Sequence, residues 1–541
     1  MTETNNMDVL FVGAGPASLA GAIRLKMRLN ELGRNESVVV IEKADKLGQH
    51  NLSGAVFEAG VFDELIPDWK EQEDTFVTRL LKNRVEVDET VFLGSGTALK
   101  IPEFVIPSNM HHKGNYTVSI SEMVNWLAGI ARGLGVEIYT GFAAREIVYE
   151  DKLVKGVRLG EKGRDKEEGK QPNYIPGEVL QANITVFGEG SLGQLSEELV
   201  DKFNLGNDRN PPIYSLGVKE IIKLPENNKF GNNRVIHTFG FPNEGTTPDI
   251  FGGGTLYSMG ENNVAVAVVL ALDWRYCDLD PQKELQLFKS HSFVKRLIEG
   301  GEVTAYGAKT LPEGGYYSIP KLVTNGALII GDAAGLTNVR KLKGLHYALK
   351  SGMLAADSIV AAIEKQDYSQ DTLGIYHELL NSSFVMRDIR GAKNYRQVFS
   401  KVGRCGLYGG LPLSLVQQLF PFKLKTEPDY KGLSRATLNR QYSGGIDRLT
   451  AVNLSGTIHR EYEPSHITFT DSGKCLSCGQ DYGYHPCAYF CPAQVYNFEG
   501  DQLILSPSNC LHCQTCRVKC PHQVIRWQVP EGGDGPRYRA M

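Results

Sequence analysis

Eight of the ten cysteines in this 541-residue chain lie in one stretch near its C-terminus. The second half of the stretch has the spacing Cys-x2-Cys-x2-Cys-x3-Cys-Pro, which is typical of bacterial ferredoxins. Three thiolates on one turn match a cuboidal [4Fe–4S] cluster, and in two-cluster ferredoxins the fourth cysteine of each run ligates the other cluster. This rule predicts two ligand sets: a first set of Cys491, Cys510, Cys513 and Cys516, and a second set of Cys475, Cys478, Cys487 and Cys520.

Structural zinc sites and disulfides are the alternatives to iron–sulfur clusters for these cysteines. Two structural zinc sites would also use paired Cys-x2-Cys, but zinc rarely needs Cys-x2-Cys-x2-Cys, so the spacing favours clusters. Eight residues separate Cys478 from Cys487, which leaves open that no second cluster forms. A disulfide framework suits a small secreted domain better than the tail of a large chain. Cys277 and Cys405 stand alone and are predicted to be buried, inert thiols.

A glycine-rich turn near the N-terminus is typical of a dinucleotide site. It joins an apolar strand at residues 7–12 to a helical pattern that begins at Pro16. Gly13 allows the tight turn, Gly15 lets the backbone approach a pyrophosphate, and the helix presents its N-terminus to that anion. Glu42 ends the next strand, where it can accept from a ribose hydroxyl. A chance glycine-rich turn is the alternative, and the flanking strand and helix disfavour it.

A second signature favours a flavin over a nicotinamide. Gly331-Asp332 follows an apolar strand at residues 327–330 and resembles the late signature of FAD-dependent enzymes, in which the aspartate binds the ribityl chain. Asp332 as an ordinary helix N-cap is the alternative, and both roles are compatible. There is one good pyrophosphate fingerprint, so a separate NAD(P)H domain is not expected. We therefore predict a bound FAD.

Composition excludes several classes of protein. The net charge is −4 and there is no long basic run, so a general nucleic-acid binder is not expected. No apolar run reaches the length of about 18 residues that a spanning helix needs. The N-terminus lacks the charged and apolar regions of a signal peptide. These features predict an intracellular protein.

Spaced motifs along nearly the whole chain support a more specific hypothesis. They are Leu52-Ser53-Gly54-Ala55, His112-Lys113-Gly114-Asn115-Tyr116, Phe251-Gly252-Gly253, Glu313-Gly314-Gly315-Tyr316, Ser318-Ile319-Pro320-Lys321-Leu322, Lys343-Gly344, Leu454-Ser455-Gly456-Thr457, Phe490-Cys491-Pro492-Ala493, Asn509-Cys510-Leu511-His512-Cys513, and Val529-Pro530-Glu531-Gly532-Gly533. With these motifs the chain resembles the electron transfer flavoprotein–ubiquinone oxidoreductase family.

The resemblance implies cofactors, partners and site residues. It implies one FAD, one [4Fe–4S] cluster on the first cysteine set, and monotopic attachment to the membrane surface. It also implies that electrons pass from reduced electron transfer flavoprotein to quinone, either ubiquinone or menaquinone. The quinone contacts correspond to Gly252 and Gly253, and the membrane-facing surface corresponds to residues 101–110 and 406–422. The FAD-binding residues correspond to Gly13, Gly15, Pro16, Ala17, Glu42, Lys43, Ser53, Gly54, Ala144, Gly188, Gly331 and Asp332.

This sequence departs from the family in three respects. Ser119 stands where the family typically has an arginine near the FAD, which leaves that contact without its usual residue. The family usually has aspartate where this chain has Cys520, and it lacks counterparts of the other second-set cysteines. We therefore predict a second cluster, as in the ferredoxin-like subunits of bifurcating flavoprotein assemblies. Gln417-Gln418 makes the second membrane-facing segment more polar than usual, which predicts weaker membrane affinity.

The predicted fold is mixed α/β with three parts. Residues 1–70, 117–200 and 320–400 form a doubly wound FAD-binding domain of the glutathione-reductase type. Residues 71–116 and 201–319 form an antiparallel-sheet domain that binds quinone and faces the membrane. Residues 401–471 are a membrane-facing segment and connector, and 472–541 are a ferredoxin-like domain.

The predicted activity is that of an electron-transferring-flavoprotein dehydrogenase, peripheral on the cytoplasmic face of the inner membrane. One alternative is an electron-transfer subunit that works only inside a larger bifurcating or fixation-type complex. A second is a flavin-dependent isoprenoid reductase of the geranylgeranyl type, which shares the FAD domain. No proton donor is assigned, because surface or packing roles are favoured for His112 and Tyr116.

Overall fold

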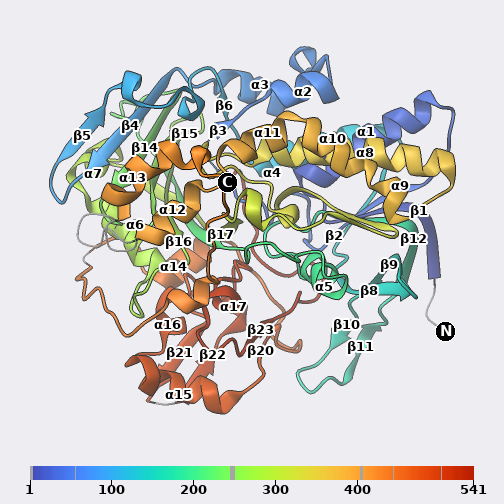
Figure 1. Ribbon diagram of the computed structural model, residues 1–541. Coiled ribbons are helices and arrows are strands. Elements are labelled where there is room, and N and C mark those ends of the chain that lie inside the picture. The colour runs from blue at the N-terminus through green and yellow to red at the C-terminus, as the bar shows by residue number, and fades with distance from the viewer. Residues whose placement is uncertain (1–3, 55, 244–249, 403–405, 443, 501) are drawn as a thin grey trace.

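A mainly parallel sheet lies on the right of the computed structural model as drawn in Figure 1, where β1, β2 and β12 are labelled. The structure describes residues 4–54, 56–243, 250–402, 406–442, 444–500 and 502–541. The eight-stranded sheet has the order β18-β19-β12-β1-β2-β7, with β8 and β9 attached to β12. Its strands are β1 (Thr4–Val12), β2 (Val38–Glu42), β7 (Glu137–Thr140), β8 (Ala144–Glu150), β9 (Leu153–Leu159), β12 (Val179–Phe187), β18 (Val323–Thr324) and β19 (Ala327–Ile329). The strands β19, β12, β1, β2 and β7 run parallel, so their carboxyl ends lie at one edge of the sheet.

Two long helices cover this sheet and bring two segments distant in the sequence together. α1 (Pro16–Glu31) packs against α8 (Leu345–Lys365). The contact is so close that a Cβ on Gly352 would meet the carbonyl oxygen of Ala17 at 1.9 Å. The glycine-rich turn before α1 and the Gly331-Asp332 segment before α8 are thereby held on the same side of the sheet.

A second, seven-stranded sheet carries the predicted quinone glycines. Its order is β17-β13-β16-β15-β14-β4-β5, and every pairing is antiparallel except β14 with β4, a parallel pair that the sequence pattern did not predict. Its strands are β4 (Val87–Leu93), β5 (Ala98–Ile101), β13 (Tyr214–Lys223), β14 (Arg234–Gly240), β15 (Gly252–Ser258), β16 (Asn263–Ala271) and β17 (Glu302–Pro312). Gly252 and Gly253 begin β15, opposite Leu270 and Val269 of β16.

Helices surround the two sheets. They are α2 (Gly60–Leu65), α3 (Thr75–Lys82), α4 (Ile120–Gly133), α5 (Gln194–Lys202), α6 (Pro281–Ser290), α7 (Ser292–Leu297), α9 (Gln370–Leu373), α10 (Ile375–Ser382), α11 (Phe384–Gly391), α12 (Tyr395–Val402) and α13 (Gly406–Val416). Short 3-10 turns are η1 (Trp69–Glu71), η2 (Glu103–Val105), η3 (Ser108–Met110), η4 (Tyr316–Ser318), η5 (Gly331–Ala334), η7 (Gln417–Leu419), η8 (Asp429–Gly432) and η9 (Pro507–Asn509). Two small antiparallel pairs are separate from both sheets: β3 (Val56–Phe57) with β6 (Tyr116–Thr117), and β10 (Lys162–Arg164) with β11 (Lys170–Ile175). No helix in these described segments is both long and apolar enough to span a bilayer.

The cysteines occupy a small domain at the end of the chain, drawn at the bottom of Figure 1. Its elements are α14 (Arg448–Leu454), β20 (Ile467–Phe469), α15 (Ser472–Tyr482), α16 (Pro486–Phe490), β21 (Tyr496–Glu499), β22 (Gln502–Leu505), α17 (Thr515–Lys519) and β23 (Ile525–Trp527). β21 pairs with β22 and β20 with β23, in both cases antiparallel. The last residues then return between the two sheets, where the Tyr538 hydroxyl accepts from the Ala308 amide at 3.2 Å.

Candidate functional site

One cavity of about 750 Å³ lies between the two sheets and reaches the cysteine domain. Every residue predicted to bind FAD or quinone lines this cavity, although these residues come from segments far apart in the sequence. Both sheets therefore contribute to a single continuous site. The binding roles of these residues stay predictions. Ala55, which belongs to one of the quoted motifs, lies outside the described residues.

The glycine-rich turn has a shape that fits a pyrophosphate. Gly13 has a φ of +94°, and a Cβ there would meet the Gly188 carbonyl oxygen at 2.7 Å. A Cβ on Gly15 would meet nothing within 4 Å, so its backbone faces open space in the cavity. Ser18 replaces the third glycine of the usual fingerprint, and its hydroxyl lies 2.1 Å from where a Cβ on Gly188 would stand. Gly188 thus makes room for Ser18, and the turn keeps its close packing.

The acidic residues of the fingerprint are fixed in different ways. Glu42 accepts from the Ala14 and Ala44 amides at 2.9 Å each, which joins the end of β2 to the glycine turn. Asp332 lies within η5, whose N-cap is Ile330, so it does not act as the helix N-cap that the sequence left open. Burial raises the pKa of Asp332, and Lys309 opposes that rise. Both carboxyl groups stand at the carboxyl edge of the parallel sheet, where dinucleotides bind.

Two buried lysines lining the cavity were missed from the sequence. Burial lowers the pKa of Lys219 on β13 to about 7 and that of Lys309 on β17 to about 8, the latter with a contribution from Lys43. Three amines around one cavity suit a ligand that carries phosphates. The sequence signal that could have indicated Lys219 is its position inside an apolar strand, β13, whose other residues are buried except the last. These residues and the glycine turn fit FAD.

The far end of the cavity is apolar and contains the glycine pair. A Cβ on Gly252 would meet the Val269 carbonyl oxygen at 2.0 Å, and one on Gly253 the Thr238 carbonyl oxygen at 2.4 Å. Side chains are therefore excluded at both positions, and the backbone lies directly on the cavity. Phe251 and Phe399 pack with ring centroids 4.8 Å apart beside the pair, and both line the cavity.

Of the two residues weighed as proton donors, His112 lines the cavity and Tyr116 does not. His112 is buried against His237, with ring centroids 4.6 Å apart. Burial lowers the pKa of His112 to about 2 and that of His237 to about 4, so both imidazoles are neutral near pH 7. Tyr116 packs edge-on against Trp69 at 6.4 Å. The expected packing role fits Tyr116.

The eight clustered cysteines are all buried, and none of the described cysteines forms a disulfide. Burial raises the pKa of the Cys510 thiol, and Cys516, Cys513 and Cys491 raise it further. The same holds in the second set, where burial and then Cys475, Cys478 and Cys520 raise the pKa of Cys487. The cysteines of each predicted set thus lie close enough for their charges to interact, and the two ligand sets stay predictions. Cys277 is buried as predicted and donates to the Ala436 carbonyl at 3.3 Å, whereas Cys405 lies outside the described residues.

The spacing of the thiols argues against zinc. Among described residues, the one group of three or more Cys, His, Asp or Glu side chains with all ligand atoms within 4.8 Å is His459, His466 and His512. Two thiolates on one zinc ion stand at most about 4.6 Å apart, because each Zn–S bond is about 2.3 Å. No three of the clustered thiols meet that limit. A cuboidal cluster separates its ligands more widely, and the donor set fits it.

The first cysteine set adjoins the flavin part of the cavity. Gln514, between two cysteines of that set, lines the cavity together with Trp527, and its side chain donates to the Leu192 carbonyl at 3.1 Å. The Lys43 ammonium lies 5.3 Å from the centroid of the Trp527 ring. The second set lies beyond the first, on α15, α16 and the end of α17. The order is therefore cavity, first set, second set.

The buried histidines of the cysteine domain were also missed from the sequence. His459 and His512 share a hydrogen bond of 2.8 Å between their Nε2 atoms, and His459 Nδ1 pairs with the Ser508 carbonyl at 3.1 Å. His50, which lines the cavity, lies edge-on to His512 at 5.3 Å. The group packs between the cavity and the Cys510 loop. His466 completes the group, with its ring stacked on His459 at 4.9 Å, and no sequence spacing brings these four rings together.

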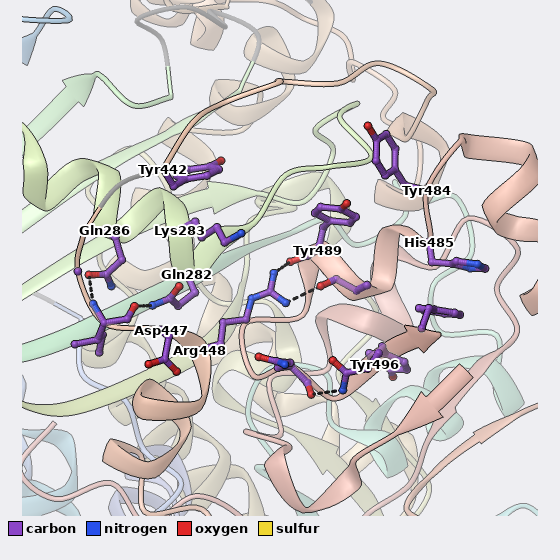
Figure 2. Close-up of a pocket in the computed structure, with 17 residues that line it drawn as sticks. Gln282, Lys283, Gln286, Tyr442, Asp447, Arg448, Tyr484, His485, Tyr489 and Tyr496 are labelled. Carbon is purple, nitrogen blue, oxygen red and sulfur yellow. Dashed lines mark hydrogen bonds between the residues drawn. The ribbon is translucent and has the colours of Figure 1, made fainter. Parts of the chain in front are cut away.

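A second cavity, of about 780 Å³, lies where the cysteine domain meets the antiparallel sheet (Figure 2). Figure 2 shows Arg448 pointing to the α16 backbone, where it donates to the Ala488 and Tyr489 carbonyls at 2.6 and 2.9 Å. Arg448 also pairs with Asp280 at the start of α6. Gln282, also on α6, donates to the Ile446 carbonyl at 2.7 Å. These contacts fasten the first cysteine run to the sheet.

A parallel sheet with a dinucleotide turn, joined to paired cluster-binding cysteines at one cavity, defines an iron–sulfur flavoprotein. In fold alone, the chain is similar to a geranylgeranyl bacteriochlorophyll reductase-like protein from Thermoplasma acidophilum (TM-score 0.54, 18% identity, 78% of this chain and 94% of that one). It is likewise similar to a flavin-dependent brominase (TM-score 0.51, 14% identity, 76% and 94%).

Sequence comparison gives the family. A model described as electron transfer flavoprotein-ubiquinone oxidoreductase, 4Fe-4S, matches residues 444–539, and one described as ETF-QO, ubiquinone-binding, matches residues 214–311. The electron transfer flavoprotein-ubiquinone oxidoreductase of Pseudomonas aeruginosa is 38% identical over 561 residues, covering 100% of both chains. The human mitochondrial protein of that name is 36% identical, covering 99% of this chain and 89% of its own. The chain belongs to the electron transfer flavoprotein–ubiquinone oxidoreductase family.

Proposed function

We propose that this protein takes electrons from reduced electron transfer flavoprotein and passes them through [4Fe–4S] and FAD to quinone at a membrane surface. The observation that carries the proposal is the single cavity, which is lined by the dinucleotide turn, by the glycine pair and by Gln514 of the cluster loop. A shared cavity supports direct contact between the three cofactor and substrate sites without a moving domain. In this proposal the first sheet is an FAD-binding domain of the glutathione-reductase type, and the C-terminal domain is ferredoxin-like.

The chain's own residues position and insulate the cofactors. FAD, when bound, supplies the chemistry that links one-electron carriers to the two-electron reduction of quinone. The glycine turn and α1 hold its pyrophosphate, and Lys43 and Lys309 balance its charge. His512 donates its amide to the Cys510 sulfur at 3.4 Å, a contact of the kind that tunes cluster potential. The clustered cysteines are buried, which excludes water from that part of the route.

The two predicted membrane-facing segments support attachment to a bilayer surface. In residues 101–110, Phe104 is 90% exposed, and in residues 406–422, Leu419 is 73% exposed. Both segments also line the cavity, through Val105 and Leu415 among others. A lipid-soluble quinone leaving the bilayer between them would enter directly beside the glycine pair. Exposed apolar side chains at the mouth of a cavity are typical of such sites.

The second cysteine set supports a second [4Fe–4S] cluster on the far side of the first. The Cys487 thiol lies close enough to Cys491 of the first set for their charges to interact. A cluster there would extend the route from the cavity toward α15. It also favours the alternative that the chain works inside a larger flavoprotein complex. The isoprenoid reductase alternative has only the fold in its favour.

The test is metal and flavin analysis of the anaerobically purified protein, with quinone reduction by chemically reduced partner flavoprotein. About eight irons per FAD are expected if both clusters assemble, and about four if only the first does. A variant with Cys520→Asp and Cys475→Ser is expected to fall from about eight to about four. Quinone reduction by the isolated chain separates the enzyme from an electron-transfer subunit. Absence of iron in protein that retains FAD would contradict the proposed route.

A further inference from the structure

A buried charge network lies directly behind the quinone end of the cavity. Arg396 on α12 is 2% exposed and holds two carboxylates, with Nε 3.1 Å from Glu313 and Nη2 2.7 Å from Asp273. The Ser400 hydroxyl bridges the same guanidinium and Asp273, at 2.6 and 2.9 Å. One guanidinium therefore serves two acids.

The network continues with one more acid and one more base. Asp429 is 2% exposed and accepts from the Tyr214 amide at 2.8 Å. The Lys519 ammonium is fully buried and lies 3.4 Å from the Asp429 carbonyl oxygen. Three carboxyl groups thus face two cations. Full ionisation would leave a net negative charge in the interior, and an unbalanced buried charge is costly, so the network retains a proton.

Glu313 is the acid of this network that lines the quinone cavity. Its partner Arg396 lies over the Phe251 ring, 4.6 Å from the centroid, and Phe251 immediately precedes Gly252. Phe251, Gly252 and Glu313 all line the same cavity. A quinone held at the glycine pair therefore lies on the side of the network where Glu313 stands.

The opposite side of the network reaches solvent. The side chain of Glu313 is 5% exposed and that of Arg396 is 2% exposed, whereas that of Asp273 is 27% exposed. Arg396 lies between the two carboxylates and stays charged, so it stabilises them without passing a proton. Glu313, which lines the cavity, can release a proton into the cavity and take one up from water there.

We propose that Glu313 is the catalytic acid that protonates quinone during its reduction, an inference that rests on the proposed function. The flavoprotein partner supplies two electrons through the bound cofactors. The Glu313 O–H bond breaks, a bond from that hydrogen to a quinone oxygen forms, and the carboxylate left behind is stabilised by Arg396. Glu313 lines the cavity, so it regains its proton from water that enters the cavity, and it then delivers the second quinol proton in the same manner.

The electrostatics are consistent with this role. Burial raises the pKa of Glu313, whereas Arg396 opposes the rise and Asp273 adds to it. Burial also raises the pKa of Asp429, and Asp273 adds to that rise, so Asp429 competes with Glu313 for the proton that the network retains. Burial raises the pKa of Tyr395, which interacts with Glu313, to about 12. The cavity histidines His112 and His237 hold no extra proton near neutral pH, because burial lowers their pKa to about 2 and about 4.

The test compares two acceptors in the full holoprotein. Ferricyanide accepts single electrons and no proton, whereas a short-chain ubiquinone accepts two electrons and two protons when it is reduced to quinol. Glu313→Gln is expected to lower kcat for quinone by about 100-fold or more, the usual contribution of a general acid, and to leave ferricyanide reduction unchanged. Glu313→Asp, which keeps the acid, is expected to retain most quinone activity with a shifted pH profile. Glu220→Gln removes an equally buried carboxylate that pairs with Lys289 away from the cavity, and serves as the control.

The outcomes separate the two proposals. Quinone reduction by Glu313→Gln at the wild-type rate and with the wild-type pH profile would overturn the assignment of Glu313. Loss of both activities in Glu313→Gln, with iron and flavin retained, would make Glu313 structural and would also overturn it. If the wild-type protein reduces ferricyanide but no quinone, the proposed function itself is wrong.

Discussion

At the scale of single residues, glycine carries much of the site, and the reason differs from one position to another. Gly13 needs both a left-handed backbone and the absence of a Cβ, because the Gly188 carbonyl stands 2.7 Å away from where a Cβ would be. Gly33 shares the left-handed conformation, with φ of +65°, but a Cβ there would meet nothing within 4 Å. Comparing alanine variants at Gly13 and Gly33 therefore distinguishes a steric clash at the site from backbone strain alone.

We predict that Gly13→Ala lowers the affinity for FAD by at least about tenfold, since left-handed strain costs about 1–3 kcal/mol and the clash adds to it. The measurement is flavin per protein after purification, with fluorescence titration of the apoprotein. Gly33→Ala, the control, is expected to keep its flavin and to lose about 1 kcal/mol of stability. Equal flavin content in the two variants would contradict the steric argument at Gly13.

The site residues that could not be predicted from the sequence are those whose contact partners are distant in the chain. Gly13, Glu42 and the cysteines were predictable, because local spacing sets their geometry. Glu313 and Arg396 are 83 residues apart, and neither has a local pattern that marks a buried ion pair. The four histidines around the Cys510 loop come from three separate segments in the same way. Tertiary packing, which no spacing rule encodes, decides these contacts.

At the scale of elements, periodic segments were predicted well, and starts that depend on caps were not. The first strand ends at Val12 and α1 begins at Pro16, as predicted. α4 begins at Ile120, where the Ser119 hydroxyl accepts from the Glu122 amide and caps the helix, a contact that apolar periodicity does not mark. The parallel pairing of β14 with β4 joins strands 147 residues apart in sequence, which alternation of apolar residues cannot reveal.

The exposed apolar elements at the cavity mouth, η2 and η7 with α13, provide a prediction at this scale. We expect Phe104→Glu combined with Leu419→Glu to weaken binding to phospholipid vesicles by about tenfold, because two large apolar side chains no longer enter the lipid. Vesicle co-sedimentation measures the change. Tyr462→Glu is the control, since Tyr462 is 76% exposed in the connector before β20. Equal binding by the double variant and the control would contradict membrane attachment through these elements.

At the scale of the whole molecule, the proposed electron route runs in one order, from the surface at α15 to the quinone. α15 carries two cysteines of the second set and has Leu476 exposed at its surface. The first set and the FAD part of the cavity come next, and the glycine pair and the membrane-facing segments lie at the other end. This order separates the docking of a protein donor from the docking of a lipid-soluble acceptor. It also means that damage at one end can leave chemistry at the other end intact.

That separation gives the last prediction. Cys487→Ser removes a ligand of the second set, and we expect it to slow reduction of the bound FAD by reduced electron transfer flavoprotein by about tenfold or more, because the outer cluster no longer relays electrons. Reoxidation of the reduced enzyme by quinone is expected to stay at the wild-type rate, since the first set and the cavity are untouched. Stopped-flow flavin absorbance follows both half-reactions. Cys277→Ser is the matched control, because Cys277 is a buried thiol whose charge reaches Cys478 but which belongs to neither set. If Cys487→Ser accepts electrons as fast as the control, electrons enter at the first set and the second serves another purpose.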